Sequence, residues 1–503
     1  MKRPASNLAN KPVVVIGAGM GGLAAAMSLA ARKVPVILIE KQATAGGKMR
    51  QLQVAGQDID SGPTVFTMRW VFEALFARAG LNFTEHLSLQ KAELLARHSW
   101  LGSESLDLHA QLDASSQAIS EFAGDKDADN YRRFARKTEA VFNTLDESFM
   151  RAQRPNPIAL SLQGGLRGML DMANTQPFIS LWNSLAKDFH DPRLRQLFAR
   201  YATYCGSSPF LAPATLMLIA HVEKAGVWMV QGGMQTLAKT LENTIKKLGV
   251  DVRYGNGVAS LDIKNNAIVG VNLDNGEHIA TQAVVFNGDT QALATGLLGK
   301  PATAASSARS ESSLSAVTQC QYACTSGYEL AHHTVFFGDD YNDEFDSVFN
   351  RKCITKNPTV YVCAQDRSGS RNTHIAKGQH ERLFSLVNAP ARELSDEEQT
   401  EAIERMRHTL GSQGLVIEDE QGHSIVTGPA EFGRLFPASD GALYGRPTHG
   451  WMGSFKRPGA KSGVHGLYLC GGSVHPGAGV PMATLSGQLA ADQLFKDYSP
   501  TAN

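Results

Sequence analysis

The sequence is poor in cysteine and lacks the cysteine patterns of a metal site or a disulfide framework. Its six cysteines, among 503 residues, form no Cys-x-x-Cys pair and no combined cysteine and histidine spacing that binds zinc. We therefore expect six unpaired thiols in a reducing compartment and no bound metal.

The sequence also lacks a charge excess of either sign. It has 48 basic and 48 acidic residues, which gives a formal net charge of zero. A nucleic-acid partner is not expected, because no basic surplus is available to neutralise phosphates. Apolar contact with a membrane needs no charge and stays open.

Long apolar runs are absent as well. The N-terminal stretch MKRPASNLANKP contains no apolar segment of a secretory signal, and no run approaches the roughly 20 residues of a membrane-spanning helix. We expect a cytoplasmic protein that at most lies on a membrane. The composition, with 43% hydrophobic and 19% charged residues, is that of a globular protein long enough for two or three domains.

What is present is a dinucleotide-binding fingerprint near the N-terminus. Val13–Ile16 predicts a buried strand, and Gly17, Gly19 and Gly22 follow as G-x-G-x-x-G before an alanine-rich helix over residues 23–31. Glycines in this pattern allow a tight turn, close approach of the backbone to a pyrophosphate, and close packing of helix on strand. The N-terminus of the helix then faces the anion.

An acidic residue stands at the end of the second predicted strand. The apolar run Val36–Ile39 ends at Glu40, which lies 18 positions after Gly22. This spacing is typical of the acid that binds a ribose diol, and its charge would repel a 2′-phosphate, which disfavours NADP. The motif alone leaves NAD and FAD open.

A second glycine motif, Gly46-Gly47 followed by Lys48, resembles that of the large FAD-binding family with a glutathione-reductase-like Rossmann domain. In that family the glycines pass close to the diphosphate and the ribityl chain of FAD. An arginine usually holds the Lys48 position, and lysine cannot make the same bidentate contact. A surface hairpin turn is the alternative interpretation.

The sequence contains no second unit of strand, G-x-G-x-x-G and helix, which a flavoenzyme reduced by NAD(P)H would normally carry. The flavin is therefore expected to be reduced by the substrate and reoxidised by oxygen, a quinone or another carrier. The pattern indicates an oxidase or a desaturase.

The C-terminal stretch LYLCGGSVHPGAGVPMATLSGQLAA predicts a strand over Leu467–Leu469, a glycine-rich loop and a helix that begins near Pro481. Proline suits the first helical position because its missing N–H has no partner there. We expect the N-terminus of this helix to face the N1/O2 edge of the flavin and to stabilise the anionic reduced ring through its partial positive charge.

Two residues are candidate catalytic groups. His475 lies in the C-terminal loop and could act as a general base, although it could instead shape the turn before Pro476 or line the flavin pocket. Asp60 could lie near the flavin, although a structural role in the hairpin around it is the alternative.

Several blocks carry a resemblance to a known family. The chain resembles the phytoene desaturase family of FAD-dependent carotenoid enzymes along essentially its whole length. The blocks that carry this resemblance are VVVIGAGMGGLAAAMSLA, DSGPTVFTM, LFSLVNAP and LYLCGGSVHPGAGVPMATLSG. Within that family the chain resembles most the 1-hydroxycarotenoid 3,4-desaturases, also called methoxyneurosporene dehydrogenases. This narrower resemblance is carried by SGPTVFTMRWVFEALF, residues 197–238 and VPMATLSGQLAA.

The pattern of elements and the resemblance together predict an α/β fold. It is a discontinuous, glutathione-reductase-like Rossmann FAD-binding domain with an inserted α+β substrate domain. We place the cofactor domain in residues 1–85, 226–300 and 441–503, and the substrate domain in residues 86–225, mainly helical and membrane-facing, and in residues 301–440.

The resemblance also implies the function. FAD would bind without a covalent link, and a C3,4 double bond would be introduced into an acyclic 1-hydroxycarotenoid by hydride transfer to flavin N5 and loss of a proton. The reaction would serve a bacterial carotenoid pathway, with peripheral attachment to the inner membrane. The alternatives are a phytoene-type desaturase, a carotenoid isomerase, an amine or porphyrinogen oxidase, and a carrier that binds isoprenoids without redox chemistry.

The residues expected to contact the cofactor are Gly17, Gly19, Met20, Gly22, Glu40, Lys41, Gly46, Gly47, Lys48, Gly62, Pro63, Thr64, Val258, Gly471, Gly472, Ser473, Gly479, Val480, Pro481 and Met482.

The block ATLMLIAHVEKAGVWMV places Leu216, Ile219 and Val222 at helical spacing. Ordinary core packing is one interpretation, and a tunnel wall or a membrane-contacting face is the other. His221 and Glu223 in the same block could meet the hydroxyl group of the substrate.

Overall fold

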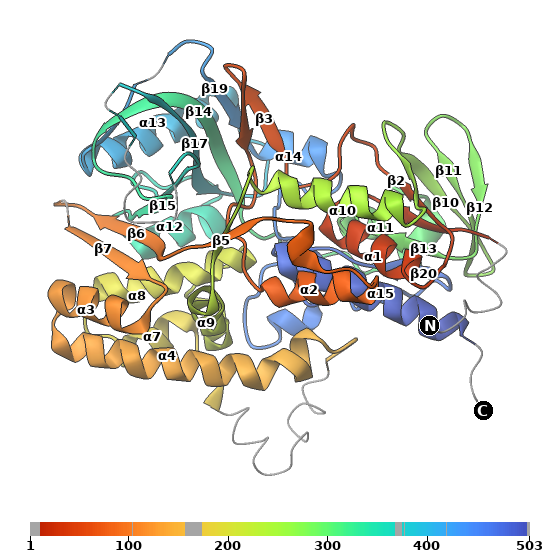
Figure 1. The fold of residues 1–503 in the computed structure, drawn as a ribbon, viewed down its shortest axis with the longest axis horizontal. Coiled ribbons are helices and arrows are strands. Elements are labelled where there is room, and N and C mark those ends of the chain that lie inside the picture. Colours follow the sequence, from red (N-terminus) through yellow and green to blue (C-terminus); the bar gives the residue numbers. More distant parts are fainter. Residues whose placement is uncertain are drawn as a thin grey trace.

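Five short segments from distant parts of the chain form one parallel sheet in the computed structural model (Figure 1). The structure describes residues 11–102, 104–155, 174–367, 375–376, 378–418 and 420–499. Every neighbouring pair is parallel. In spatial order the strands are β20 (Leu467–Leu469), β13 (Val284–Phe286), β1 (Val13–Ile16), β2 (Val36–Ile39) and β9 (Asp251–Arg253).

The strands β20, β13, β1 and β2 are almost wholly apolar because the sheet is covered on both faces, whereas the edge strand β9 is Asp-Val-Arg. One face packs against helices, and the other packs against an antiparallel sheet. The helices of the first face are α1 (Met20–Ala30), α2 (Arg69–Arg78), α10 (Gln235–Lys247) and α15 (Val480–Tyr498). The antiparallel sheet consists of β10 (Val258–Lys264), β11 (Ala267–Leu273) and β12 (His278–Ala280).

The helices α1 and α15 approach each other closely behind the glycine turn. A Cβ atom on Gly487 of α15 would lie 2.0 Å from the carbonyl oxygen of Gly21 on α1. Only a residue without a side chain therefore allows this separation. All eleven residues of α1 are buried, which explains why the sequence there is made mostly of glycine, alanine and apolar residues.

A second, eight-stranded sheet lies beside the first sheet, at the upper left of Figure 1. Its pairings are antiparallel except that of β15 with β6. The strands are β6 (Leu94–Trp100), β7 (Glu104–His109), β14 (Ser315–Gly327), β15 (His333–Phe336), β16 (Val360–Ala364), β17 (His380–Ala389), β18 (Leu415–Ile417) and β19 (Ser424–Thr427).

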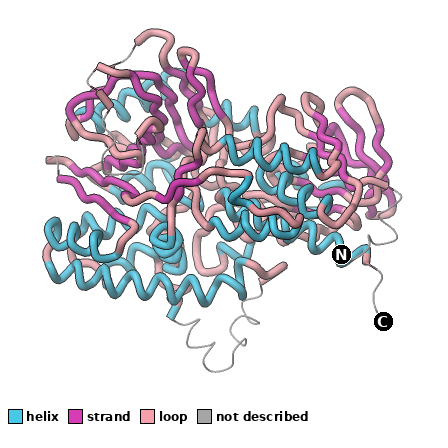
Figure 2. Tube along the Cα trace, in the orientation of Figure 1, coloured by secondary structure: helices cyan, strands magenta, loops and turns pink. Residues whose placement is uncertain are grey.

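Helix α13 (Asp396–Ser412) packs on one face of this sheet. Ser395 and Glu398 form a capping box at its N-terminus. The other face turns toward a group of helices, at the lower left of Figures 1 and 2. These helices are α3 (Leu112–Ala123), α4 (Asp125–Leu145), α7 (Leu181–Asp188), α8 (Pro192–Ala199) and α9 (Leu218–Ala225), with the short helices η3 (Arg200–Cys205) and η4 (Ala214–Met217).

Smaller elements complete the part of the chain that the structure describes. Two further antiparallel sheets have two strands each. They are the hairpin of β3 (Gln51–Val54) with β4 (Gln57–Asp60), and the pair of β5 (Leu89–Lys91) with β8 (Trp228–Val230), which are distant in the chain. The remaining elements are η1 (Phe83–Glu85), η2 (Asp146–Met150), α11 (Gln291–Ala294), η5 (Lys300–Ala305), α12 (Tyr341–Asp346), η6 (Ser347–Arg351), α14 (Pro429–Leu435) and η7 (Gly453–Lys456).

The fold class agrees with the prediction, and one part of the chain differs in detail. Residues 86–225, predicted to be mainly helical, also supply β5, β6 and β7. Strand β6 pairs in parallel with β15, more than 200 residues later in the chain. Such a pairing depends on a distant partner, so local periodicity could not indicate it. The domain boundaries themselves stay a prediction.

Candidate active site

A cavity of about 1140 Å³ runs from the parallel sheet to the face of the eight-stranded sheet. Every residue expected to contact the cofactor lines this cavity except Gly22. The structure thus brings together segments that are more than 400 residues apart in the chain. Their direct contact with a cofactor stays a prediction.

The first glycine turn lies at the carboxyl end of β1. Gly17 has a φ of +96°, which favours glycine. A Cβ atom on Gly22 would lie 2.0 Å from the carbonyl oxygen of Gly17, so the third glycine sits behind the turn and lets α1 pack against it. The second motif lies alongside, because the N–H of Gly46 donates to the carbonyl of Ala18 at 2.9 Å.

Glu40 follows β2 and is held by backbone groups. Its Oε2 accepts a hydrogen bond from the N–H of Ala18 at 2.6 Å, and its Oε1 accepts one from the N–H of Gln42 at 2.8 Å. The carboxylate therefore lies at the glycine turn, in the wall of the cavity, together with Lys41 and Val258. An acid fixed in this place fits the ribose of a dinucleotide.

The C-terminal loop closes the opposite side. Helix α15 begins at Val480 with Pro481 in its first turn, as predicted. Among the described residues no side chain caps this helix, so its first N–H groups are available to an anionic ligand. Two glycine turns, a ribose-binding acid and an uncapped helix N-terminus in one cavity fit FAD.

Lys48 stands in the cavity wall where the related family usually has arginine. Its Nζ donates to the carbonyl of Leu443 and lies 5.3 Å from the centre of the Phe436 ring. Burial lowers the pKa of Lys48 to about 8, against the opposing effect of Asp289. A lysine with this pKa carries its charge at neutral pH and loses it at moderately alkaline pH.

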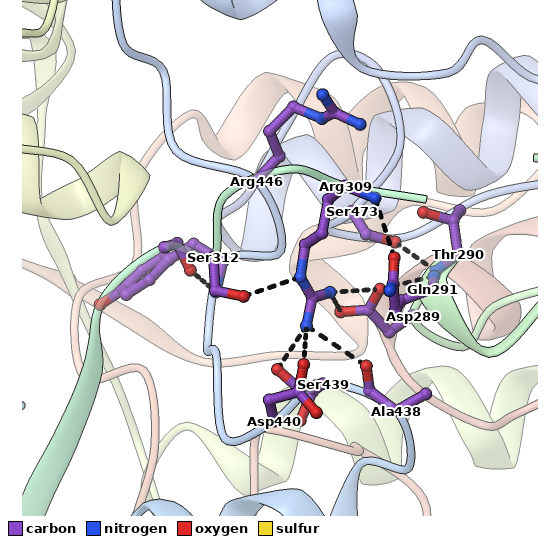
Figure 3. A network of polar contacts seen from close by, with 12 residues as sticks. Asp289, Thr290, Gln291, Arg309, Ser312, Ala438, Ser439, Asp440, Arg446 and Ser473 are labelled. Carbon is purple, nitrogen blue, oxygen red and sulfur yellow. Dashed lines mark hydrogen bonds and ion pairs between the residues drawn. The ribbon is translucent and has the colours of Figure 1, made fainter. Parts of the chain in front are cut away.

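Sequence reasoning missed a buried ion pair that supports the C-terminal loop (Figure 3). Arg309 contacts both carboxylate oxygens of Asp289 at 3.0 Å and donates to the backbone carbonyls of Ala438 and Ser439. The next residue, Thr290, donates its N–H to Ser473 Oγ at 3.2 Å. The network thus ties the end of β13 to the loop expected to hold the cofactor.

Two further residues of the cavity wall were missed. Asn287 donates from Nδ2 to the carbonyl of Gly17 at 3.2 Å, and it lies between the glycine turn and Gly471. The buried Arg457 donates to the carbonyl of Gly472 at 2.9 Å. Asn287 and Asp289 had a signal in the sequence, because the polar run Asn287-Gly288-Asp289 directly follows a buried strand. Arg457 had no comparable signal.

The two candidate catalytic residues lie outside the cavity wall. Asp60 accepts hydrogen bonds from the N–H groups of Met234 and Gln235, at the start of α10, and its burial raises its pKa. The His475 ring contacts Phe149 edge-on and its Nε2 donates to the Phe149 carbonyl at 3.0 Å. Burial lowers the pKa of His475 to about 4. Both positions suit a structural role, and a catalytic role stays a prediction.

Beyond the cofactor cradle the cavity is largely apolar. Leu216, Ile219 and Val222 line it, so the tunnel-wall interpretation of this block is the one that the cavity supports. The eight-stranded sheet contributes Val335 and Leu386 on the facing side.

Two groups of side chains have ligand atoms close enough to hold a metal ion, at 4.8 Å or less from one another. They are His332, His333 and Cys363, and His380, Glu420 and His423. Neither group belongs to the cavity wall.

The chain was compared with known proteins. The family model described as flavin containing amine oxidoreductase matches residues 20–495. The hydroxyneurosporene desaturase of Rubrivivax gelatinosus is 48% identical over 498 residues, which cover 97% of this chain and 94% of that protein. The 1-hydroxycarotenoid 3,4-desaturase of a Flavobacterium species is 27% identical, with coverage of 96% and 98%.

Solved structures share the fold at low identity. A mutant of putrescine oxidase has a TM-score of 0.57 at 13% identity and covers 97% of this chain, with 98% of its own chain matched. Cyclohexylamine oxidase from Brevibacterium oxydans has a TM-score of 0.55 at 13% identity, with coverage of 97% and 99%. This likeness concerns the fold alone.

Proposed function

We propose that this chain introduces a C3,4 double bond into acyclic 1-hydroxycarotenoids. The premise is its family, since the chain belongs to the flavin-containing amine oxidoreductases and, among them, to the phytoene desaturase-type carotenoid enzymes. The chain is an FAD-dependent oxidoreductase acting on CH–CH bonds. The observation that carries the proposal is that the residues of the dinucleotide cradle and a set of apolar residues line one and the same cavity.

When bound, FAD supplies the acceptor for the hydride that leaves the carotenoid. The chain itself contributes position and surroundings. The apolar walls from α9 and the eight-stranded sheet hold the polyene and exclude water, and the N-terminus of α15 offers partial positive charge to an anionic ring. Positive charge delocalised along the polyene reduces the need for a counter-ion from the protein.

The electron acceptor is oxygen or a quinone in this proposal. The support is the lack of a second dinucleotide fingerprint in the sequence, which leaves NAD(P)H without a binding unit of the usual kind.

We also propose that the protein attaches peripherally to the cytoplasmic face of the inner membrane. No helix in the described part of the chain has the length and apolar character needed to cross a bilayer. Phe178 and Leu211 are 77% and 51% exposed, and the Phe178 ring lies 5.3 Å from that of the exposed Trp451. Trp451 also lines the cavity, so the apolar surface adjoins a route to the site.

Turnover in vitro tests the proposed reaction. The FAD-loaded protein is incubated with an acyclic 1-hydroxycarotenoid in air or with a quinone, and the lengthening of the conjugated system is followed by absorption and mass spectrometry. We expect a product two hydrogens lighter. A product of unchanged mass would indicate an isomerase, conversion of phytoene alone would indicate a phytoene-type desaturase, and an unchanged hydroxycarotenoid would refute the proposal.

A further inference from the structure

A group of buried polar side chains interrupts the apolar part of the cavity. Arg200 and Tyr204 on η3, and Glu223 on α9, all line it. Glu223 is only 4% exposed and Arg200 only 8%. An ion pair buried in apolar surroundings is costly to desolvate and is weak evidence of stabilisation by itself. Its presence in a ligand cavity therefore calls for an explanation beyond packing.

The internal hydrogen bonds of this group are almost, but not fully, complete. Glu223 accepts from Tyr201 Oη at 2.6 Å, from Tyr204 Oη, and from Arg200 Nη2 at 3.2 Å. A carboxylate offers about four acceptor positions, so one remains. Among the described residues Arg200 donates one N–H of Nη1 to Tyr204 Oη at 2.9 Å and one N–H of Nη2 to Glu223. A guanidinium has five N–H donors, so donors on Arg200 and one acceptor position on Glu223 are left, which a hydroxyl group can satisfy.

A second group of polar side chains belongs to the same cavity. Thr64 Oγ1 and Tyr361 Oη are 2.7 Å apart, and Tyr361 Oη lies 2.7 Å from His333 Nδ1. Thr64 and Tyr361 line the cavity together with Tyr204. Thr64 belongs to the Gly62-Pro63-Thr64 segment expected to hold the cofactor, so the polar group and the cofactor cradle share one cavity.

The chemistry of the substrate requires such a location. In a 1-hydroxycarotenoid the oxygen is separated from C3 by C1 and C2 only, so a hydroxyl-binding group must lie beside the site of C3,4 desaturation and cannot lie at the far end of the channel. Polar groups elsewhere in the channel would bind the hydroxyl with the wrong carbons at the reacting position.

We propose that Arg200, Tyr204 and Glu223 bind the tertiary hydroxyl group of the substrate and thereby determine which carbons of the chain are desaturated. This inference rests on the proposed function. The hydroxyl donates to the free position on Glu223 and accepts from an unused N–H of the Arg200 guanidinium, and Tyr204, which lines the cavity, is the third polar contact. A site built to hydrogen-bond a hydroxyl discriminates against an analogue without it, because the buried polar groups then stay unpaired.

A matched pair of acyclic carotenoids, with and without the 1-hydroxyl group, tests the inference. We expect Tyr204→Phe to lower kcat/KM for the hydroxylated substrate about tenfold, with little change for the analogue. Glu223→Gln should act in the same direction. A second readout is equilibrium binding of the hydroxylated product, followed through flavin absorbance, whose Kd should rise by a similar factor.

Tyr201→Phe is the control, because Tyr201 donates to the same carboxylate but does not line the cavity. It should alter both substrates by the same factor. Melting temperature and FAD content verify folding, and if Glu223→Gln does not fold, the near-isosteric Tyr204→Phe carries the test. Equal losses on both carotenoids would overturn the inference, as would a parent enzyme indifferent to the hydroxyl. A parent enzyme inactive on both would instead refute the proposed function.

Discussion

Lys48 and His475 are two basic side chains with strongly lowered pKa values, and they differ in what they face. Lys48 points into the cavity wall, where an anionic cofactor would meet it. His475 does not line the cavity, and its ring donates to the backbone carbonyl of Phe149. The lowered pKa therefore predicts an effect on cofactor binding for the lysine and an effect on folding stability for the histidine.

The affinity for FAD should fall as pH rises above 8. Lys48 in the free protein has a pKa of about 8, and a bound anion raises it, so binding takes up a proton at alkaline pH. We expect the affinity to fall about tenfold between pH 7 and pH 9. Titration calorimetry of the apoprotein with FAD measures it. Lys48→Arg keeps the charge and should remove the dependence, whereas an unchanged pH profile in that variant would contradict this role.

Acid should destabilise the protein in part through His475. The pKa of His475 is about 4 in the folded protein, against an ordinary value of 6.5. Between pH 4 and pH 6.5 the unfolded state therefore binds a proton on this residue that the folded state does not. Stability is thus complete above pH 6.5 and is lost as pH falls toward 4, by up to about 3 kcal/mol. His475→Gln should show a smaller drop in melting temperature over this range than the parent.

The same variant tests the catalytic hypothesis. An amide can still donate to the Phe149 carbonyl, so a structural role predicts kcat within a few fold of the parent. A loss of kcat of more than about a hundredfold at unchanged FAD content would restore His475 as a general base, since such groups contribute roughly 10²–10⁴-fold.

At the scale of elements, the separation of α1 and α15 depends on one glycine. Gly487→Ala would place a methyl group against the carbonyl of Gly21 and should destabilise the protein by about 1–3 kcal/mol. Chemical denaturation measures the loss of stability, and the variant should also lose FAD faster than the parent. Gly411 is the matched control, because it lies in α13 with open space around it. Gly411→Ala should be neutral or stabilising by up to about 1 kcal/mol. Equal effects would contradict the packing argument.

The elements with local signals were predictable from the sequence. The strands β1, β2 and β20 are short apolar runs that end at glycine or polar residues, and each lies where predicted. The start of helix α15 was likewise indicated by a single residue, Pro481.

What could not be predicted depends on pairs distant in the chain. The ion pair of Asp289 with Arg309 joins two loops that carry no local pattern. The sequence named Glu223 as a residue that could meet the hydroxyl group of the substrate, but only the fold brings Arg200, Tyr201 and Tyr204 around its carboxylate. The glycine spacing thus predicted the segments that line the cofactor side of the cavity, whereas on the substrate side the sequence indicated Glu223 without its partners.

At the scale of the whole molecule, the cavity joins a cofactor cradle to an exposed apolar surface. The two ends serve different phases, since FAD enters from water and a carotenoid resides in lipid. A protein with zero net charge has no overall electrostatic attraction to an anionic bilayer. The proposed attachment would then depend on apolar side chains that insert at the interface, and such binding resists salt.

We therefore expect binding to vesicles of phosphatidylethanolamine and phosphatidylglycerol that persists in 1 M NaCl. Phe178→Ser with Leu211→Ser should weaken it at least tenfold, because each side chain loses on the order of 1–2 kcal/mol of burial in the interface. Neither residue lines the cavity, so turnover of detergent-dispersed substrate tests whether the site is intact. Val416→Ser, at an exposed apolar residue of β18, is the control and should bind as the parent does. Release of the parent by salt alone would contradict apolar attachment.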